Sequence, residues 1–223
     1  MKDSNKTILQ RSILFSDLND NNLKAALTFF DATEKSYIKN QTFINPGENL
    51  GRFGLVLKGT VQIYTLDIDG FQMIMATVLA GETFGESLSY LGRKSEIFAT
   101  ALTDCSVLWL NPKNIREGNI KSEEEKLLLN RFISLLATRA LTMNDRIQIL
   151  SKLTIREKLV AFFTESVRKY KSYSFILPLD RCDMAIYLGC DRSALSRELS
   201  KMSREGLISF NGKNFTVNIQ KIL

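Results

Sequence analysis

Residues 189–208, GCDRSALSRELSKMSREGLI, combine basic and hydroxyl side chains with a regular apolar spacing. Leu195, Leu199 and Met202 are separated by four and three positions, which predicts a helix with one buried face. The candidate contact residues lie outside that stripe: Asp191, Arg192, Ser193, Ser196, Arg197 and Lys201. An arginine fork matches guanine O6 and N7 or a phosphate, and a serine is short enough to approach a base edge. Solvation would explain a single arginine, whereas this set favours contact with DNA.

The segment before this helix carries the signals of a second, shorter helix. Asp180 is a predicted N-cap for a helix that begins at Arg181, and Asp183 lies near its positively polarised end. Gly189 then supplies a turn, and Asp191 is the predicted N-cap of the following helix. The residues expected to face inward from the first helix are Met184, Ala185 and Leu188.

A hairpin is expected after the two helices. Residues 206–217 read GLISFNGKNFTV, which predicts two strands joined by a two-residue loop at Asn211–Gly212. Helix, turn, helix and wing together predict a winged helix-turn-helix. Charge supports this interpretation, because residues 1–151 carry 17 basic and 17 acidic side chains, whereas residues 152–223 carry 13 and 7. A basic surplus in one segment indicates a polyanionic partner or a solvated basic surface.

The first half of the chain has a different character. Eight of the 12 glycines fall between Gly47 and Gly92, and short apolar segments lie between them. The expected strands are FGLVLKG, TVQIYTLDI, FQMIMATVLA, FATALTD and CSVLWL, with a hairpin tip at residues 68–70. Many short strands with regular glycines predict an antiparallel sandwich or roll.

Residues 119–177 contain no glycine and no proline, which predicts helix up to Pro178. Apolar side chains recur there at spacings of three or four: Leu129, Phe132, Leu136, Ala140, Met143, Ile147 and Leu150. A narrow seam of this kind favours a parallel partner helix and hence a homodimer. The alternative is an amphipathic helix that packs on its own domain.

Composition limits the remaining classes. A chain of 223 residues with 44% hydrophobic content can form about two domains. Three scattered cysteines argue against a disulfide framework and favour a reducing cytoplasm. The N-terminus lacks the apolar core of a signal peptide, and no apolar run approaches the ~20 residues of a membrane helix. We therefore expect a soluble cytoplasmic protein without a membrane partner.

Three motifs resemble one family of bacterial regulators. PGENLGRFGLVLKGTVQIY and AGETFGESLSYLG resemble the β-roll of cyclic-nucleotide-binding domains. LDRCDMAIYLGCDRSALSRELSKMSREGLIS resembles the helix-turn-helix of the Crp/Fnr family, which includes the cyclic-AMP receptor protein. The resemblance implies an α+β chain: a β-roll of the jelly-roll type over residues 1–121, a dimerisation helix over 122–151 and a winged helix-turn-helix over 152–223. It also implies a homodimer on a two-fold-symmetric promoter site, acting through RNA polymerase.

The resemblance also directs attention to an effector site between the roll and the long helix. Its expected lining is Leu79, Phe84, Glu86, Leu88, Phe98 and Thr100, with Thr142 from the helix. Cyclic-AMP binders carry an Arg-Ser pair before the next strand, where this chain has Ser95-Glu96. An acidic residue there disfavours a phosphate, so we expect an effector other than cyclic AMP, or none.

Other chemistries are disfavoured. The chain has no histidine, which excludes His-ligated haem, and its three cysteines are too few for a four-cysteine iron–sulfur cluster. We therefore predict no metal and no cofactor. Catalytic nucleotide-binding motifs are also lacking, so we expect no enzyme activity. Cys182 and Cys190 leave a redox switch or simple packing open, and the alternative function is a regulatory module that acts on a partner protein.

Overall fold

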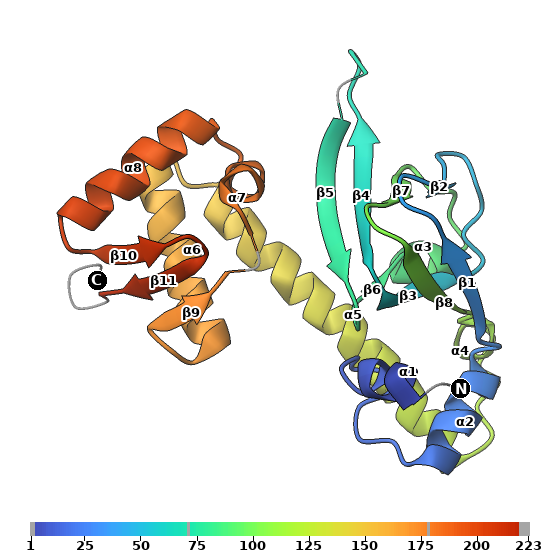
Figure 1. Ribbon diagram of the computed structural model, residues 1–223. Coiled ribbons are helices and arrows are strands. Elements are labelled where there is room, and N and C mark those ends of the chain that lie inside the picture. Colours follow the sequence, from blue (N-terminus) through green and yellow to red (C-terminus); the bar gives the residue numbers. More distant parts are fainter. Residues whose placement is uncertain (1–2, 71, 178, 219–223) are drawn as a thin grey trace. The chain divides into compact units, whose positions relative to one another are not determined.

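The computed structural model describes residues 3–70, 72–177 and 179–218 (Figure 1). Phe71, Pro178 and the last five residues of the predicted DNA-binding domain lie outside the described residues. The chain forms two compact units, Met1–Thr138 and Arg139–Leu223. The boundary lies inside one long helix, whereas the predicted three-part division treats that helix as a separate part.

The N-terminal unit contains two four-stranded antiparallel sheets. One sheet has the order β1-β8-β3-β6, from β1 (Thr33–Tyr37), β8 (Cys105–Leu110), β3 (Phe53–Lys58) and β6 (Thr83–Phe84). The other has the order β2-β7-β4-β5, from β2 (Thr42–Ile44), β7 (Phe98–Ala101), β4 (Thr60–Leu66) and β5 (Gln72–Leu79). The five predicted strands correspond to β3, β4, β5, β7 and β8, and the predicted hairpin tip joins β4 to β5. The predicted sandwich is therefore confirmed.

Two apolar clusters hold this unit together. Side chains from both sheets, including Val56, Val61 and Val107, form one cluster. The second includes side chains of β3, the helices α1 (Asp3–Leu9) and α2 (Asp20–Phe29), and the start of the long helix. Two shorter helices, α3 (Glu86–Leu91) and α4 (Lys113–Arg116), complete the unit. The sequence patterns do not predict α1 to α4, of which α1, α3 and α4 are two turns long or shorter.

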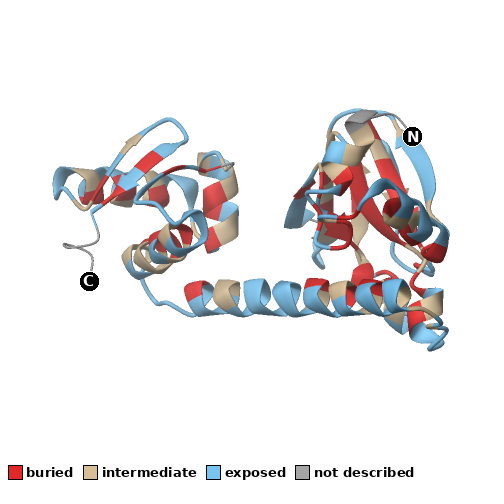
Figure 2. Cartoon of the chain, turned by 90° about the horizontal axis from the view of Figure 1, so that it is seen from below, coloured by how far each residue is buried: buried red, intermediate tan, exposed pale blue. Residues whose placement is uncertain are grey.

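The long helix α5 spans Glu123–Leu150. Leu128, Phe132 and Leu135 are buried in the core of the N-terminal unit. The middle of the helix is exposed, as the pale blue ribbon in Figure 2 shows. Phe132 is only 1% exposed and packs against Phe53 at a centroid distance of 5.6 Å. Its predicted place in a seam facing a partner helix is therefore wrong, because the ring fills the core of its own chain.

The predicted helix over 119–177 is interrupted. After α5, Thr154 caps a new helix, α6 (Ile155–Tyr170), and forms a capping box with Glu157. The pattern Thr-x-x-Glu is a known helix-start signal, although neither glycine nor proline marks the break. The segment then ends in a strand, β9 (Ser174–Ile176), instead of helix.

The C-terminal unit has the predicted winged helix-turn-helix. Helices α7 (Arg181–Leu188) and α8 (Arg192–Arg204) are followed by the strands β10 (Ile208–Asn211) and β11 (Asn214–Val217). Strand β11 pairs with both β10 and β9 in a three-stranded sheet. The register pairs Asn211 with Asn214, so the hairpin loop is Gly212–Lys213, one residue later than predicted. Gly212 has a φ of 59°, which a glycine adopts readily.

Candidate nucleic-acid interface

Two capped helices and one glycine turn position α8. The Asp180 carboxylate accepts hydrogen bonds from the Cys182 and Asp183 amides, at 2.8 and 2.9 Å, and caps α7. Gly189 ends α7 with a φ of 58°. The Asp191 carboxylate accepts a 2.8 Å bond from the Ala194 amide and caps α8. The predicted caps and turn are confirmed, and Asp191 therefore has a structural role at the start of the candidate interface.

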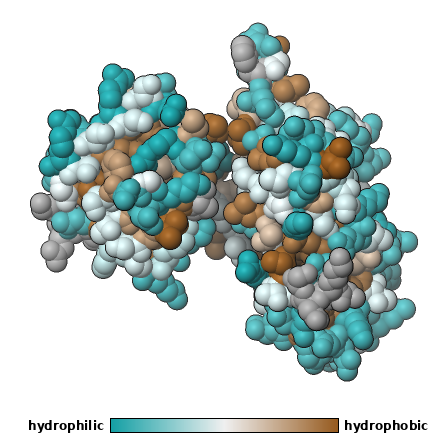
Figure 3. Space-filling model, in the orientation of Figure 1, coloured by the Kyte–Doolittle hydropathy of each residue, from teal (hydrophilic) through white to brown (hydrophobic). Residues whose placement is uncertain are grey.

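A buried stripe fixes which side of α8 faces outward. Leu195, Leu199 and Met202 are at most 1% exposed, and they pack in one core with side chains of α6, α7 and the wing. The predicted inward residues of α7, Met184, Ala185 and Leu188, are buried in the same core. Of the predicted contact residues, Ser196 is half-buried and the others are exposed: Asp191, Arg192, Ser193, Arg197 and Lys201. The surface around α8 is mostly teal and white in Figure 3.

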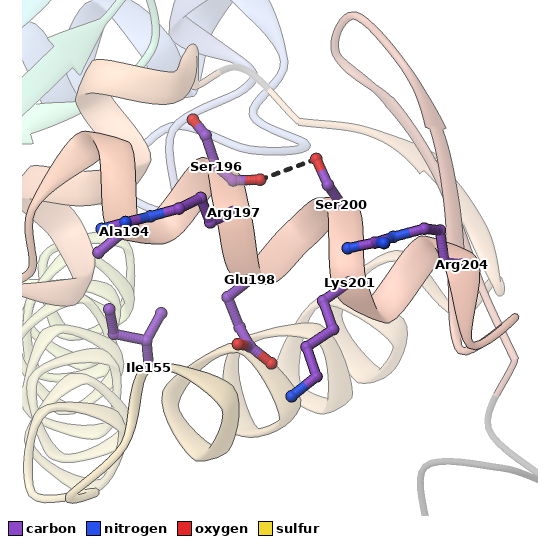
Figure 4. A pocket seen from close by; sticks show the side chains of 8 residues that line it. All are labelled: Ile155, Ala194, Ser196, Arg197, Glu198, Ser200, Lys201 and Arg204. Atoms are coloured by element: carbon purple, nitrogen blue, oxygen red, sulfur yellow. Dashed lines mark hydrogen bonds between the residues drawn. The ribbon is translucent and has the colours of Figure 1, made fainter.

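An open groove of about 630 Å³ runs beside α8 (Figure 4). It is lined by Ile155, Ala194, Ser196, Arg197, Glu198, Ser200, Lys201 and Arg204. Ser200 and Arg204 were absent from the sequence-based set, although they follow Arg197 by three and seven positions on the same helix face. The Ser200 hydroxyl donates to the Ser196 carbonyl at 2.9 Å. The groove therefore presents three cationic side chains along one side of the helix.

Each carboxylate on or next to α8 has a structural role: Asp191 caps the helix, and Glu198 and Glu205 are paired with a cation. Arg156, in the first turn of α6, donates from Nε to Glu198 at 2.6 Å. Its two terminal nitrogens donate to Glu205 at 2.7 and 2.9 Å. These hydrogen bonds lower the pKa of Glu205 below its usual range. Arg197, Lys201 and Arg204 thus offer hydrogen-bond donors, the chemistry that guanine edges and phosphates require.

Two further cations support the helix-turn-helix. The Lys158 ammonium donates to the carbonyls of Leu188 and Gly189, at 3.0 and 3.3 Å. A side chain of α6 thus supplies hydrogen-bond donors to the carbonyl groups at the C-terminal end of α7. The Arg181 guanidinium lies over the Phe210 and Phe215 rings, at 4.5 and 5.0 Å, and connects α7 to the wing. Sequence reasoning missed both residues, because their partners are about 30 positions away along the chain.

The two cysteines of this unit have different surroundings. Burial raises the pKa of the Cys190 thiol, which packs against the core of the unit. A raised pKa lowers the thiolate fraction, the reactive form in redox chemistry. Cys182 is exposed. The packing interpretation of Cys190 is therefore the better supported of the two.

Two of the predicted effector residues of the roll, Phe84 and Glu86, are buried. Phe84 is 5% exposed and packs against the Trp109 ring at 5.6 Å. A Cβ on Gly54 would lie 2.2 Å from the Phe84 ring, so the glycine makes room for it in the core. Phe84 is therefore a core residue instead of an open pocket wall. Glu86 is buried and accepts a hydrogen bond from the Thr83 hydroxyl.

The other predicted effector residues are more accessible. Leu79 is 40% exposed, and Leu88, Phe98 and Thr100 are half-buried in the N-terminal unit. The Thr100 hydroxyl is hydrogen-bonded to the Thr42 hydroxyl at 2.7 Å. The remaining predicted residue, Thr142, is exposed on the part of α5 that belongs to the C-terminal unit.

Ser95 and Glu96, at the position of the Arg-Ser pair of cyclic-AMP binders, form a local turn. Ser95 is 2% exposed, and its hydroxyl donates to the Ile97 carbonyl at 2.9 Å. The same hydroxyl accepts a bond from the Ile97 amide at 3.2 Å. Glu96 beside it is exposed. Neither side chain resembles a cationic phosphate cradle.

The chain matches two family models. Residues 34–118 match the cyclic nucleotide-binding domain, and residues 157–221 match the Crp-like helix-turn-helix domain. Within the described residues, no helix combines the length and apolarity needed to cross a bilayer.

Named relatives agree with both matches. The anaerobic regulatory protein of Haemophilus influenzae is 27% identical over 191 residues, which cover 83% of this chain and 72% of that protein. The fumarate and nitrate reduction regulatory protein of Escherichia coli is 26% identical over 189 residues, 82% and 74% of the two chains. The solved structure of FixK2 from Bradyrhizobium japonicum has a TM-score of 0.62 and 27% identity, and the match covers 86% of this chain and 95% of that one.

A roll of the cyclic-nucleotide-binding type followed by this helix-turn-helix defines a DNA-binding transcriptional regulator. The chain belongs to the Crp/Fnr family. Members of this family are regulators of transcription and not enzymes, and the predicted family and fold are confirmed.

Proposed function

We propose that the protein binds a two-fold-symmetric promoter site as a homodimer and regulates transcription through RNA polymerase in the cytoplasm. Helix α8 of each subunit enters the major groove, with Arg197 on a guanine edge. Arg192, Lys201 and Arg204 contact phosphates, and the hydroxyls of Ser193 and Ser196 approach the bases. The resemblance to other Crp/Fnr regulators supports the polymerase contact.

One observation carries this proposal. The outer face of α8 exposes Arg197, Lys201 and Arg204, while the opposite face is anchored in the core by three buried apolar side chains. A helix held so firmly can present its side chains at fixed positions, as base recognition requires. Solvation alone does not require this alignment of cations around one groove.

The proposed dimer uses the exposed part of α5. Met143 and Ile147 are 65% and 60% exposed, and Ala140 and Leu150 are exposed beside them at seam spacing. Large apolar side chains at helical spacing on an exposed helix are typical of a partner interface. A parallel arrangement would put the two recognition helices about 34 Å apart, one turn of DNA.

On this proposal, an effector is a neutral or weakly polar small molecule and not cyclic AMP. The buried hydroxyl of Ser95 and the exposed carboxylate of Glu96 support the exclusion of a cyclic phosphate. Leu79, Leu88 and Phe98 offer the apolar surface that such a ligand would contact. The effector would change DNA binding by its different affinities for two arrangements of the dimer.

Selection from a random DNA library tests the function. The full chain should enrich one palindromic sequence with a guanine in each half-site. Binding to that sequence should exceed binding to random DNA by at least about 1,000-fold. Weak, salt-sensitive binding without any enriched sequence would contradict the proposal, because it is the behaviour of an unspecific basic surface.

A further inference from the structure

Arg156 forms a bridge between the start of α6 and the side of the groove beside α8. Its Nε contacts Glu198 and its terminal nitrogens bind Glu205 in a two-pronged arrangement, all between 2.6 and 2.9 Å. The Arg156 side chain is 35% exposed, and those of Glu198 and Glu205 are 21% and 37% exposed. One arginine thus holds two carboxylates, one from the middle of the recognition helix and one from its C-cap.

The position of Glu198 makes this bridge relevant to DNA. Glu198 lines the same groove as Arg197, Lys201 and Arg204 (Figure 4). It precedes Lys201 by three positions on α8, so a released carboxylate would be able to pair with that cation. A carboxylate beside the groove would also repel phosphates, and it could accept a hydrogen bond from a cytosine amino group.

We propose that Arg156 is a positioning residue for DNA recognition, which holds the Glu198 and Glu205 carboxylates so that Arg197, Lys201 and Arg204 stay free to contact DNA. The inference rests on the proposed function, in which α8 reads the operator. In this proposal neither Arg156 nor Glu198 contacts a base of the operator. The operator is therefore read through acceptor groups such as guanine O6 and N7.

Charge sets the size of the expected effect. Replacing Arg156 by glutamine removes one positive charge per subunit and releases two carboxylates, whose distance from a phosphate of bound DNA we take as about 10 Å for the estimate. Coulomb interactions at that distance in water correspond to roughly a twofold change per subunit. A freed carboxylate that pairs with Lys201 adds to this loss, so we expect a roughly three- to tenfold rise in Kd for the dimer.

The experiment compares four variants of the full chain on the selected operator and on random DNA. These are Arg156→Gln, Glu198→Gln, the pair Arg156→Gln with Glu198→Gln, and Lys171→Gln. The double variant restores the net charge of the wild type, and Lys171→Gln, which loses one cation without releasing a carboxylate, shows how much of the change comes from net charge alone. Lys171 is exposed at the other end of α6 and serves as the matched control for the loss of one cation. Circular dichroism and thermal unfolding establish that each variant is folded at the assay temperature.

We expect Arg156→Gln to weaken binding to both DNAs three- to tenfold and to reduce the salt dependence of binding. The double variant should return to within about twofold of the wild type on both measures, and Lys171→Gln should stay within about twofold. Glu198→Gln alone should keep its preference for the operator.

Two results would overturn the inference while leaving the proposed function intact. One is a double variant that is folded but binds as weakly as Arg156→Gln, which would limit Arg156 to a structural role. The other is a Glu198→Gln variant that loses its preference for the operator, which would make Glu198 a base contact. If the wild-type chain shows no preferred sequence, the proposed function fails first and this inference fails with it.

Discussion

The homodimer makes a quantitative prediction for Met143 and Ile147. Their side chains are 65% and 60% exposed in the single chain. Fully burying a side chain of this size contributes about 1.5–3 kcal/mol, so burying the exposed part contributes about 1–2 kcal/mol. Four such side chains in a symmetric dimer contribute about 4–8 kcal/mol, which corresponds to roughly a thousand- to a millionfold change in dimer affinity.

Replacing both residues by lysine should therefore produce monomers of 25.3 kDa in sedimentation velocity at about 10 µM protein. Because both side chains are exposed, the circular dichroism spectrum should remain that of the wild type. Gln148→Lys, at an exposed polar position of the same helix, is the matched control and should leave the dimer intact. Leu136 is a poor position for this test, because it packs against the core of the N-terminal unit. A folded Met143→Lys/Ile147→Lys variant that still sediments as a dimer would refute the proposed interface.

Two further predictions concern the roll and the turn. Calorimetry should detect no binding of cyclic AMP at physiological concentrations, because Ser95 is bonded within a local turn and Glu96 is acidic; micromolar binding would contradict this explanation. Gly189→Ala should lower the free energy of unfolding by about 1–2 kcal/mol in a urea titration, since φ is 58°. The added Cβ would also lie 3.3 Å from the Leu150 side chain, whereas at Gly212, with a φ of 59°, it would meet open space. Gly212→Ala should therefore cost less, and an equal cost at both glycines would argue against the Leu150 contact.

Local signals made the helix-turn-helix predictable. Asp180, Gly189 and Asp191 act within a few residues of their own positions, and their hydrogen bonds follow from chain geometry. The hairpin was found for the same reason, although its loop lies one residue later than the Asn-Gly pair indicated. The Thr154–Glu157 capping box was also visible as a pattern and would have revealed the break between α5 and α6.

Long-range packing explains what the sequence could not reveal. Phe132 fits the apolar spacing of the seam, but periodicity cannot tell whether a helix face meets its own domain or a partner. Phe84 is an apolar residue that would suit the wall of a pocket. Its burial depends on Gly54 and Trp109, which are distant in sequence and pack against its ring. Arg156 carries no local signal, because its acidic partners lie 42 and 49 positions later in the chain.

The most direct test of the central claim is the operator preference of the Arg197→Ala variant, measured as the ratio of its Kd values for random and selected DNA. Arg197 is exposed on the outer face of α8, and a bidentate contact to guanine contributes about 1–3 kcal/mol of discrimination. We predict that the variant loses this amount per half-site and that selection no longer specifies the guanine at that position. An equal loss of affinity on selected and random DNA would contradict the account, because Arg197 would then contact only phosphate.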